Sequence, residues 1–224
     1  MTKLPKLPIG IQTFEKLREG GFLYVDKTKY LIDLIDNGSV YFLSRPRRFG
    51  KSLTISTFAA LFSGKRELFK GLYAEEFCSR PEYTPHPVVK LDMSNLTTDM
   101  GPDTLRSSIL YQLKKNADNL GVKIETTLPG DAFDELLSRS AIKYGASVVV
   151  LIDEYDKPIL DNFDDPEKAE IARDILRNFY GRIKAADMYV RFVFITGISK
   201  FSKVGVFSAM NNLIDIRNGI SNLP

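Results

Sequence analysis

The sequence has 224 residues, of which 44% are hydrophobic and 26% charged, with a formal net charge of +3. This is the composition of a globular chain with one sizeable core, and so mild a charge does not by itself indicate nucleic-acid binding. The single cysteine, Cys78, excludes an intramolecular disulfide, and no apolar run approaches the roughly 18 residues of a membrane span. We therefore expect a cytoplasmic protein with no membrane partner.

Short apolar strands alternate with longer helices along the chain. Runs rich in β-branched and aromatic residues predict four strands, over 39–43, 87–93, 147–152 and 191–196. Helical spacing predicts four main helices, over 52–64, 102–121, 131–145 and 165–187. The third strand, SVVVLI, is apolar throughout, which is typical of a central parallel strand covered on both faces. The order predicts an α/β fold, with a parallel sheet and helices on both faces.

The stretch SRPRRFGKS, residues 44–52, ends like a phosphate-binding loop, or Walker A motif. Such a loop needs a preceding strand, backbone N–H groups that surround the phosphates, a lysine, a hydroxyl for Mg²⁺ and a following helix. Gly50, Lys51 and Ser52 stand in the required order between a predicted strand and a predicted helix. A plain helix start capped by a hydroxyl is the alternative.

The first glycine of the usual motif is replaced here by Arg45. A residue that precedes proline is pushed towards extended geometry, so Pro46 favours Arg45 as a continuation of the strand. Gly50 stands where the backbone must come close to phosphate, and it is kept. We therefore expect a working loop.

The third predicted strand ends in Asp153 and Glu154, which resembles a Walker B motif. One carboxylate at such a position serves Mg²⁺ and a second orients the attacking water, so we assign Asp153 to the metal and Glu154 to the water. Acidic residues after a strand also cap helices, which is the alternative. The coincidence with Lys51 favours the functional interpretation.

Arg47 and Arg48, with Arg45 and Lys51, place four positive charges in seven residues. Such a cluster attracts the phosphates of nucleotide or of nucleic acid, and its place inside the loop favours nucleotide. Phe49 is interpreted as a hydrophobic anchor of the loop, with stacking on a base as the alternative.

Four blocks in order resemble the AAA-ATPase-like family of bacterial proteins: YVDKT (24–28), RPRRFGKS (45–52), LIDEYDKP (151–158) and TGISKFSKVGVFSAMNNLIDI (196–216). In that family the Arg-Pro start of the loop is the normal pattern. The resemblance implies a P-loop NTPase of the additional-strand type, in which the strand ending at Thr196 separates the Walker A and Walker B strands. It also implies ATP and Mg²⁺ as ligands.

The resemblance extends to individual residues. It implies that Lys51 binds the β- and γ-phosphates, that Ser52 and Asp153 hold Mg²⁺, and that Glu154 and Thr196 act in catalysis. Thr196 would be a polar sensor of the γ-phosphate, with a plain strand-ending turn as the alternative. Tyr24 and Asp26 would border the adenine, with simple packing as the alternative. The remaining residues expected to bind nucleotide are Arg47, Arg48, Phe49, Gly50 and Leu53.

We expect residues 1–38 to form an N-terminal helical element beside the nucleotide site, and residues 39–224 an ATPase core that is C-terminally truncated. The predicted function is Mg²⁺-dependent ATP hydrolysis that switches or drives an attached effector domain. Members of the family often carry a PD-(D/E)xK nuclease-like domain after the ATPase, and nucleic acid and a second copy of the chain are open as partners. The alternative is a nucleotide- or nucleic-acid-binding module without turnover.

Overall fold

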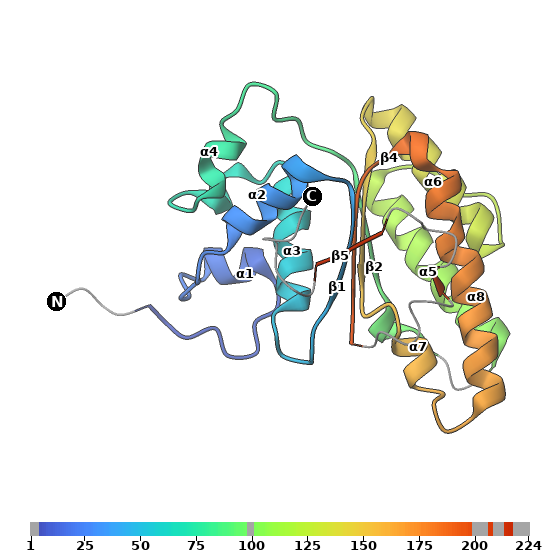
Figure 1. Ribbon diagram of the computed structural model, residues 1–224. Helices are drawn as coiled ribbons and strands as arrows, with labels where there is room; N and C mark the ends of the chain where they lie inside the picture. Colours follow the sequence, from blue (N-terminus) through green and yellow to red (C-terminus); the bar gives the residue numbers. More distant parts are fainter. Residues whose placement is uncertain (1–4, 98–100, 199–205, 208–212, 217–224) are drawn as a thin grey trace.

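The computed structural model describes residues 5–97, 101–198, 206–207 and 213–216. Figure 1 shows a sheet seen nearly edge-on with a layer of helices on each side. The strands are β1 (Val40–Ser44), β2 (Val88–Asp92), β3 (Val148–Asp153), β4 (Val190–Gly197) and β5 (Ile214–Asp215). All their pairings are parallel, and their order across the sheet is β2-β3-β4-β1-β5.

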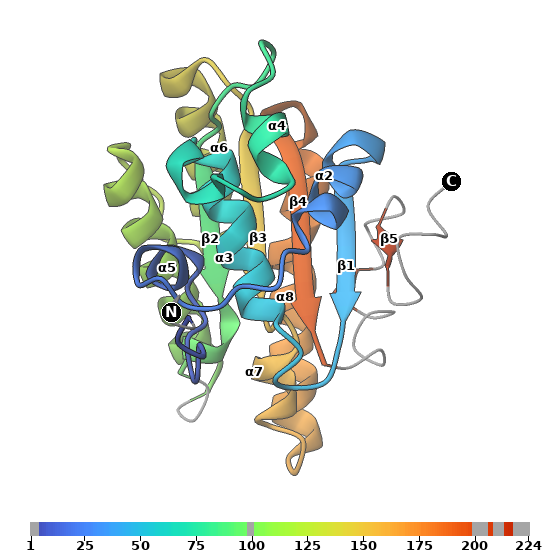
Figure 2. The ribbon, with the colours of Figure 1, turned by 90° about the vertical axis from the view of Figure 1, so that its left-hand side faces the viewer.

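The position of β4 between β1 and β3 confirms the predicted additional-strand topology. Figure 2 shows this order face-on, with the loop after β1 at the lower ends of the strands. In the β1–β4 register Leu43 lies opposite Thr196, and in the β2–β3 register Asp92 lies opposite Asp153. Parallel strands end on the same edge of a sheet, so this arrangement gathers polar strand ends at one edge.

One helical layer consists of the N-terminal helices and the helix after the phosphate loop: α1 (Phe14–Glu19), α2 (Thr28–Asn37), α3 (Lys51–Phe62) and α4 (Ala74–Cys78). The other layer holds α5 (Pro102–Leu120), α6 (Pro129–Tyr144), α7 (Lys157–Leu160) and α8 (Pro166–Ala185). Three short 3₁₀ turns are η1 (Arg66–Phe69), η2 (Met93–Asn95) and η3 (Asp187–Tyr189). No helix in the described ranges is both long and apolar enough to cross a membrane.

Two hydrophobic cores lie on the two faces of the sheet. Successive side chains of a strand point to opposite faces, and β3 divides accordingly: Val150 belongs to the core under α5, α6 and α8, whereas Val149 and Leu151 belong to the core under α1–α4. Every residue of β3 is buried. This explains why its sequence is apolar without alternation.

The four predicted strands and the four main predicted helices are confirmed, with boundaries that differ by a few residues. The structure adds the two-residue strand β5 and the short helices α4 and α7, and in the expected N-terminal helical element it has α1 and α2. Phe14 of α1 and Leu31 of α2 lie in the same core as Phe58 of α3. The described part of the predicted N-terminal element therefore shares a core with the phosphate-loop helix.

Candidate nucleotide-binding site

The candidate phosphate-binding loop between β1 and α3 contains two residues with a left-handed backbone. Gly50, the residue before α3, has a φ of +76°, and Arg48 has a φ of +68°. A Cβ placed on Gly50 would meet nothing within 4 Å, so glycine is required there by the left-handed backbone and not by lack of space. Arg48 adopts the same left-handed region at a cost, as residues in functional loops often do.

Lys51 starts α3 with its side chain turned back onto the loop. Its Nζ donates to the carbonyl oxygens of Arg45 and Pro46, at 3.0 and 3.1 Å, and the residue is buried. Ser52 follows in the first turn of α3, where free backbone N–H groups and the helix dipole favour an anion. Lysine, hydroxyl and helix end are thus brought together as the motif predicts.

Arg45 continues the strand, as the following proline predicts. Its N–H donates to the carbonyl oxygen of Gly197 at 3.1 Å, which extends the β1–β4 ladder by one residue. Among the described non-glycine residues, positive φ values are found at Arg48 and Glu154 but not at Arg45. Arginine therefore replaces the usual first glycine without backbone strain.

The carboxylates of Asp153 and Glu154, at the end of β3 and directly after it, differ in burial and in backbone conformation. Asp153 is 4% exposed and is the last residue of the strand, whereas Glu154 leaves the strand with a φ of +52°. A left-handed glutamate is uncommon and costs about 1 kcal/mol or more, so neighbouring contacts must hold it. Glu154 lines the cavity described below, whereas the buried Asp153 is not among the lining residues.

Thr196, at the end of β4, supplies those contacts. Its hydroxyl donates to Asp153 Oδ1 and accepts from the Glu154 N–H at 3.2 Å, and its carbonyl oxygen accepts from the Tyr155 N–H at 2.9 Å. Thr196 is fully buried and is not part of the cavity lining. The Thr196 hydroxyl thus contacts both Asp153 and the backbone of Glu154, and the γ-phosphate sensor that the family resemblance implies stays a prediction.

The segment after Thr196 is fixed on two sides. Both carboxylate oxygens of the fully buried Asp156 lie within 3.3 Å of the Ile198 N–H, and Ser44 Oγ donates to the Ile198 carbonyl oxygen at 3.0 Å. A Cβ on Gly197 would lie 2.4 Å from the Tyr155 ring. The end of β4 is therefore bonded to the phosphate-loop strand and to the turn after β3.

A cavity of about 700 Å³ lies over the loop, within the size range of ligand pockets. Glu154 and the loop form part of its wall, and the rest comes from the N-terminal segment. The lining residues are Ile9, Gly10, Ile11, Gln12, Arg47, Arg48, Gly50, Lys51, Ser52, Leu53 and Glu154. The sequence analysis missed Ile9–Gln12; the only local signal is Gly10, which turns the chain with a φ of +73°.

A second cavity, of about 310 Å³, adjoins the first through Gly50 and Leu53. It is largely apolar, with Leu23, Tyr24 and Phe49 among its lining residues. Phe49 is 67% exposed, so it does not anchor the loop in a core as we expected. Tyr24 does border a cavity beside the loop.

Asp26 lies outside both cavity linings. Its carboxylate accepts from the N–H and hydroxyl of Thr28, at 2.8 and 2.7 Å, and from the N–H of Tyr73 at 2.7 Å. Burial raises the pKa of Asp26, but these hydrogen bonds outweigh that effect and lower the pKa below its ordinary value. Asp26 thus fixes the start of α2, and the contact with adenine implied by the family resemblance is not supported by this geometry.

The pKa of Glu154 is raised, first by burial and then by the neighbouring charge of Asp153. The charges of Lys51 and Arg47 act in the opposite direction. A carboxylate whose pKa is shifted upward in a cavity is suited to accept a proton from water.

The donor set suits Mg²⁺, which takes oxygen ligands and keeps part of its water shell. Of the two carboxylate oxygens of Asp153, Oδ1 accepts a hydrogen bond from Thr196, and within the described residues no hydrogen bond is found for Oδ2 or for Ser52 Oγ. Ser52 and Asp153, the residues expected to hold the metal, therefore each have an oxygen atom to offer.

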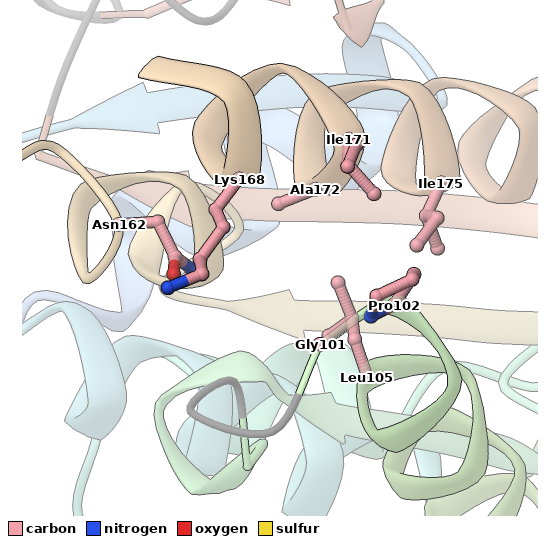
Figure 3. A pocket seen from close by; sticks show the side chains of 8 residues that line it. All are labelled: Gly101, Pro102, Leu105, Asn162, Lys168, Ile171, Ala172 and Ile175. Carbon is pink, nitrogen blue, oxygen red and sulfur yellow. The ribbon is translucent and has the colours of Figure 1, made fainter. Parts of the chain in front are cut away.

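A further hollow lies in the other helical layer and is shown in Figure 3. Leu105 of α5 faces Ile171 and Ile175 of α8 across it, and its volume is about 20 Å³. That space is close to the size of one water molecule, so it is no nucleotide site.

Comparisons with known proteins find relatives of most of this chain. A family described as "Predicted AAA-ATPase" matches residues 8–207. A protein of Azotobacter chroococcum mcd 1, described as an uncharacterized protein in the vnfD 5′ region, is 47% identical over 213 residues. That alignment covers 94% of this chain and 40% of the relative, so the chain spans less than half of the relative's length.

Among solved structures, the chain is similar to one in the structure of Drosophila ORC bound to GC-rich DNA and Cdc6, with 11% identity and a TM-score of 0.40. That match covers 84% of this chain and 52% of the other. The family match includes both the candidate phosphate loop and the carboxylates of Asp153 and Glu154. This chain belongs to the AAA-ATPase-like family.

Proposed function

We propose that this chain binds ATP and hydrolyses it with Mg²⁺. The observation that carries the proposal is that one cavity is lined by both the phosphate loop and Glu154, which lie about a hundred residues apart in the sequence. A capped helix start would need no such partner, and Glu154, with its φ of +52°, is not the N-cap of α7, which is Asp156. Membership of the family supports the same function.

In this proposal the triphosphate lies in the larger cavity. Backbone N–H groups at the start of α3, with Lys51, Arg47 and Arg48, receive the negative charge. The adjoining apolar cavity offers a surface of the right chemistry for the base, since it shares Leu53 with the larger one and includes the exposed ring of Phe49.

Ser52 and Asp153 would hold Mg²⁺, which neutralises phosphate charge when bound. Glu154 would orient the attacking water and accept its proton, for which its raised pKa is favourable. Thr196 acts behind them, because its hydroxyl bonds Asp153 and the Glu154 N–H simultaneously.

The test compares ATP hydrolysis and ATP binding in the natural full-length protein and its Glu154→Gln variant. Glutamine keeps the shape and the hydrogen-bonding reach but loses the charge, so hydrolysis should fall by roughly 10²-fold or more while binding survives. Asp153→Asn should instead weaken Mg²⁺-dependent binding, because a metal ligand acts in the ground state too. Wild-type turnover in Glu154→Gln would make Glu154 a structural residue, and ATP bound without turnover by the wild type would favour a binding module.

We further propose that hydrolysis switches or drives another part of a longer protein. The relative of Azotobacter chroococcum supports this, since the match leaves 60% of its length outside the aligned region. A nuclease-like domain, nucleic acid and a second copy of the chain are the partners to examine first. Measuring the ATPase rate of the full-length protein with and without single- or double-stranded DNA tests the second of them.

A further inference from the structure

The end of β4 lies between the phosphate loop and the turn after β3 and is hydrogen-bonded to both. The Arg45 N–H donates to the Gly197 carbonyl oxygen at 3.1 Å. Ser44 Oγ donates to the Ile198 carbonyl oxygen at 3.0 Å. From the other side, the Asp156 carboxylate accepts the Ile198 N–H, with Oδ2 at 3.0 Å and Oδ1 at 3.3 Å. Ile198 thus bonds with its carbonyl to the strand that enters the loop and with its N–H to the turn that follows β3.

The bonds on the loop side lead to the lysine of the phosphate loop. Lys51 Nζ donates to the carbonyl oxygen of Arg45, the same residue whose N–H bonds to Gly197. Ser44, the last residue of β1, is buried, so packing holds it as well as the hydrogen bond to Ile198. Because a close-packed strand end has little space in which to relax, a shift of Ile198 should move the start of the loop with it.

On the other side, Asp156 and Glu154 belong to one tight turn. The Lys157 N–H donates to the Glu154 carbonyl oxygen at 2.9 Å, which closes the turn that runs from Glu154 to Lys157. Asp156 lies within this turn and is fully buried. A buried carboxylate is costly unless it accepts hydrogen bonds, and the Ile198 N–H supplies one. A change in how Asp156 is held should therefore change where the turn places Glu154.

We propose that Asp156 and Ser44 are positioning residues that act through Ile198 to hold the phosphate loop and Glu154 at a fixed separation. Their role rests on the ATPase function proposed above. Neither side chain lines the cavity over the loop, so both act through geometry and not by touching nucleotide. In that reaction the water oriented by Glu154 must face the γ-phosphate held by the loop, and a misplacement of about 1 Å can cost roughly 10²-fold in rate.

The two side-chain bonds meet at Ile198, so each ties the loop to the turn only while the other is made. If Ser44 releases the Ile198 carbonyl, the bond from Asp156 holds Ile198 but no longer links it to the loop through Ser44, and the reverse also holds. The backbone bond from Arg45 to Gly197 is the same in every side-chain variant, so a comparison of variants isolates the bonds to Ile198. The effects of Ser44 and Asp156 on the rate should therefore be coupled, whereas unconnected residues would have effects that multiply.

The first experiment measures kcat and KM for ATP in the natural full-length protein. Ser44→Ala removes one hydrogen bond and should lower kcat by about 5- to 10-fold with little change in KM, and Ser44→Thr, which keeps a hydroxyl, should recover most of the rate. Ser140→Ala is the matched control, because Ser140 Oγ is buried in α6 and has no hydrogen-bond partner among the described residues. Both constants should stay at their wild-type values in this control. A wild-type kcat in Ser44→Ala, or a change confined to KM, would overturn the proposal.

The second experiment tests the coupling. Asp156→Asn replaces an ionised acceptor by a neutral one, which forms a hydrogen bond about half as strong, so kcat should fall by about 10-fold while ATP binding is kept. In the double variant, Ser44→Ala with Asp156→Asn, kcat should equal that of the slower single variant. If the separate losses multiply, to roughly 50-fold or more, the two residues act independently and the link through Ile198 is overturned. Ser44→Ala leaves the buried carboxylate in place, so it decides the question alone if Asp156→Asn does not fold.

Amide hydrogen exchange keeps the test independent of turnover. The exchange rate of the Ile198 N–H, measured without nucleotide, reports the bond that it donates to Asp156. Asp156→Asn should raise this rate by about 10-fold, and Ser140→Ala should leave it unchanged. An unchanged rate in Asp156→Asn would overturn this inference alone. A wild type that hydrolyses no ATP would overturn the proposed function, and the positioning role with it.

Discussion

Replacing Gly197 by alanine isolates one steric contact on which the site depends. The added Cβ would lie 2.4 Å from two carbons of the Tyr155 ring and 3.0 Å from Asp156 Oδ1. Tyr155 is fully buried against Phe42 and Phe207, with ring centroids at 5.4 and 4.8 Å, so it has no free direction in which to move. The backbone of Gly197 is not left-handed, so the cost is steric alone.

Overpacking of this kind typically costs about 1–3 kcal/mol of unfolding free energy. For a chain of this length each kcal/mol lowers Tm by roughly 2–4 °C, which predicts a decrease of about 2–12 °C in thermal unfolding. Gly181→Ala is the matched control, because Gly181 lies inside α8 with nothing within 4 Å of an added Cβ. That change should raise Tm slightly, since alanine favours a helix by about 1 kcal/mol over glycine.

A Gly197→Ala protein with an unchanged or higher Tm would refute the close approach of Gly197 to Tyr155. The functional consequence offers a second check. Tyr155 directly follows Glu154, so a displaced ring should lower ATP hydrolysis more than ATP binding. An equal loss of both in a folded variant would mean that the contact does not act through Glu154.

Two further predictions concern the supports of the site. Thr196→Val removes the hydroxyl that bonds Asp153 and the Glu154 N–H, so the kcat of ATP hydrolysis should fall by about 10-fold or more with little change in KM. Thr196→Ser keeps the hydroxyl and should stay near the wild-type rate. Equal rates for the two variants would contradict this role. Asp26→Asn should lower the unfolding free energy at neutral pH. The folded pKa of Asp26 lies below its ordinary value of 3.8, so the ionised carboxylate stabilises the fold at pH values above 3.8. In urea titrations the difference from wild type should shrink as the pH falls through the lowered pKa, and a difference that is constant with pH would contradict it.

The sequence predicts the central features because each has a local cause. The strand β3 is apolar since it is covered on both faces, and the phosphate loop is marked by Gly50, Lys51 and Ser52 beside each other. The order of β4 between β1 and β3 came from the family resemblance, since nothing in the spacing of strands fixes their order in space.

The features that were missed depend on contacts between distant residues. Ile9–Gln12 line the cavity because the N-terminal segment returns to the loop, and the sequence shows only a glycine turn there. The hydrogen bonds of Thr196 were not predicted either, because the registers of β4 with its neighbours bring its hydroxyl to Asp153. The family resemblance assigned Asp26 to the adenine border, whereas its carboxylate oxygens accept hydrogen bonds from Thr28 and Tyr73.

Calorimetric titration of ATP with Mg²⁺ into the wild type and Lys51→Ala tests the central claim most directly. The Lys51 ammonium lies at the floor of the loop, and a charge-assisted contact contributes about 1.5–3 kcal/mol, so the variant should bind ATP roughly 10- to 150-fold more weakly. Lys114→Ala, an exposed change on α5, should bind as the wild type does. If Lys51→Ala keeps its fold and binds ATP with wild-type affinity, the loop is not the nucleotide site and the account is wrong.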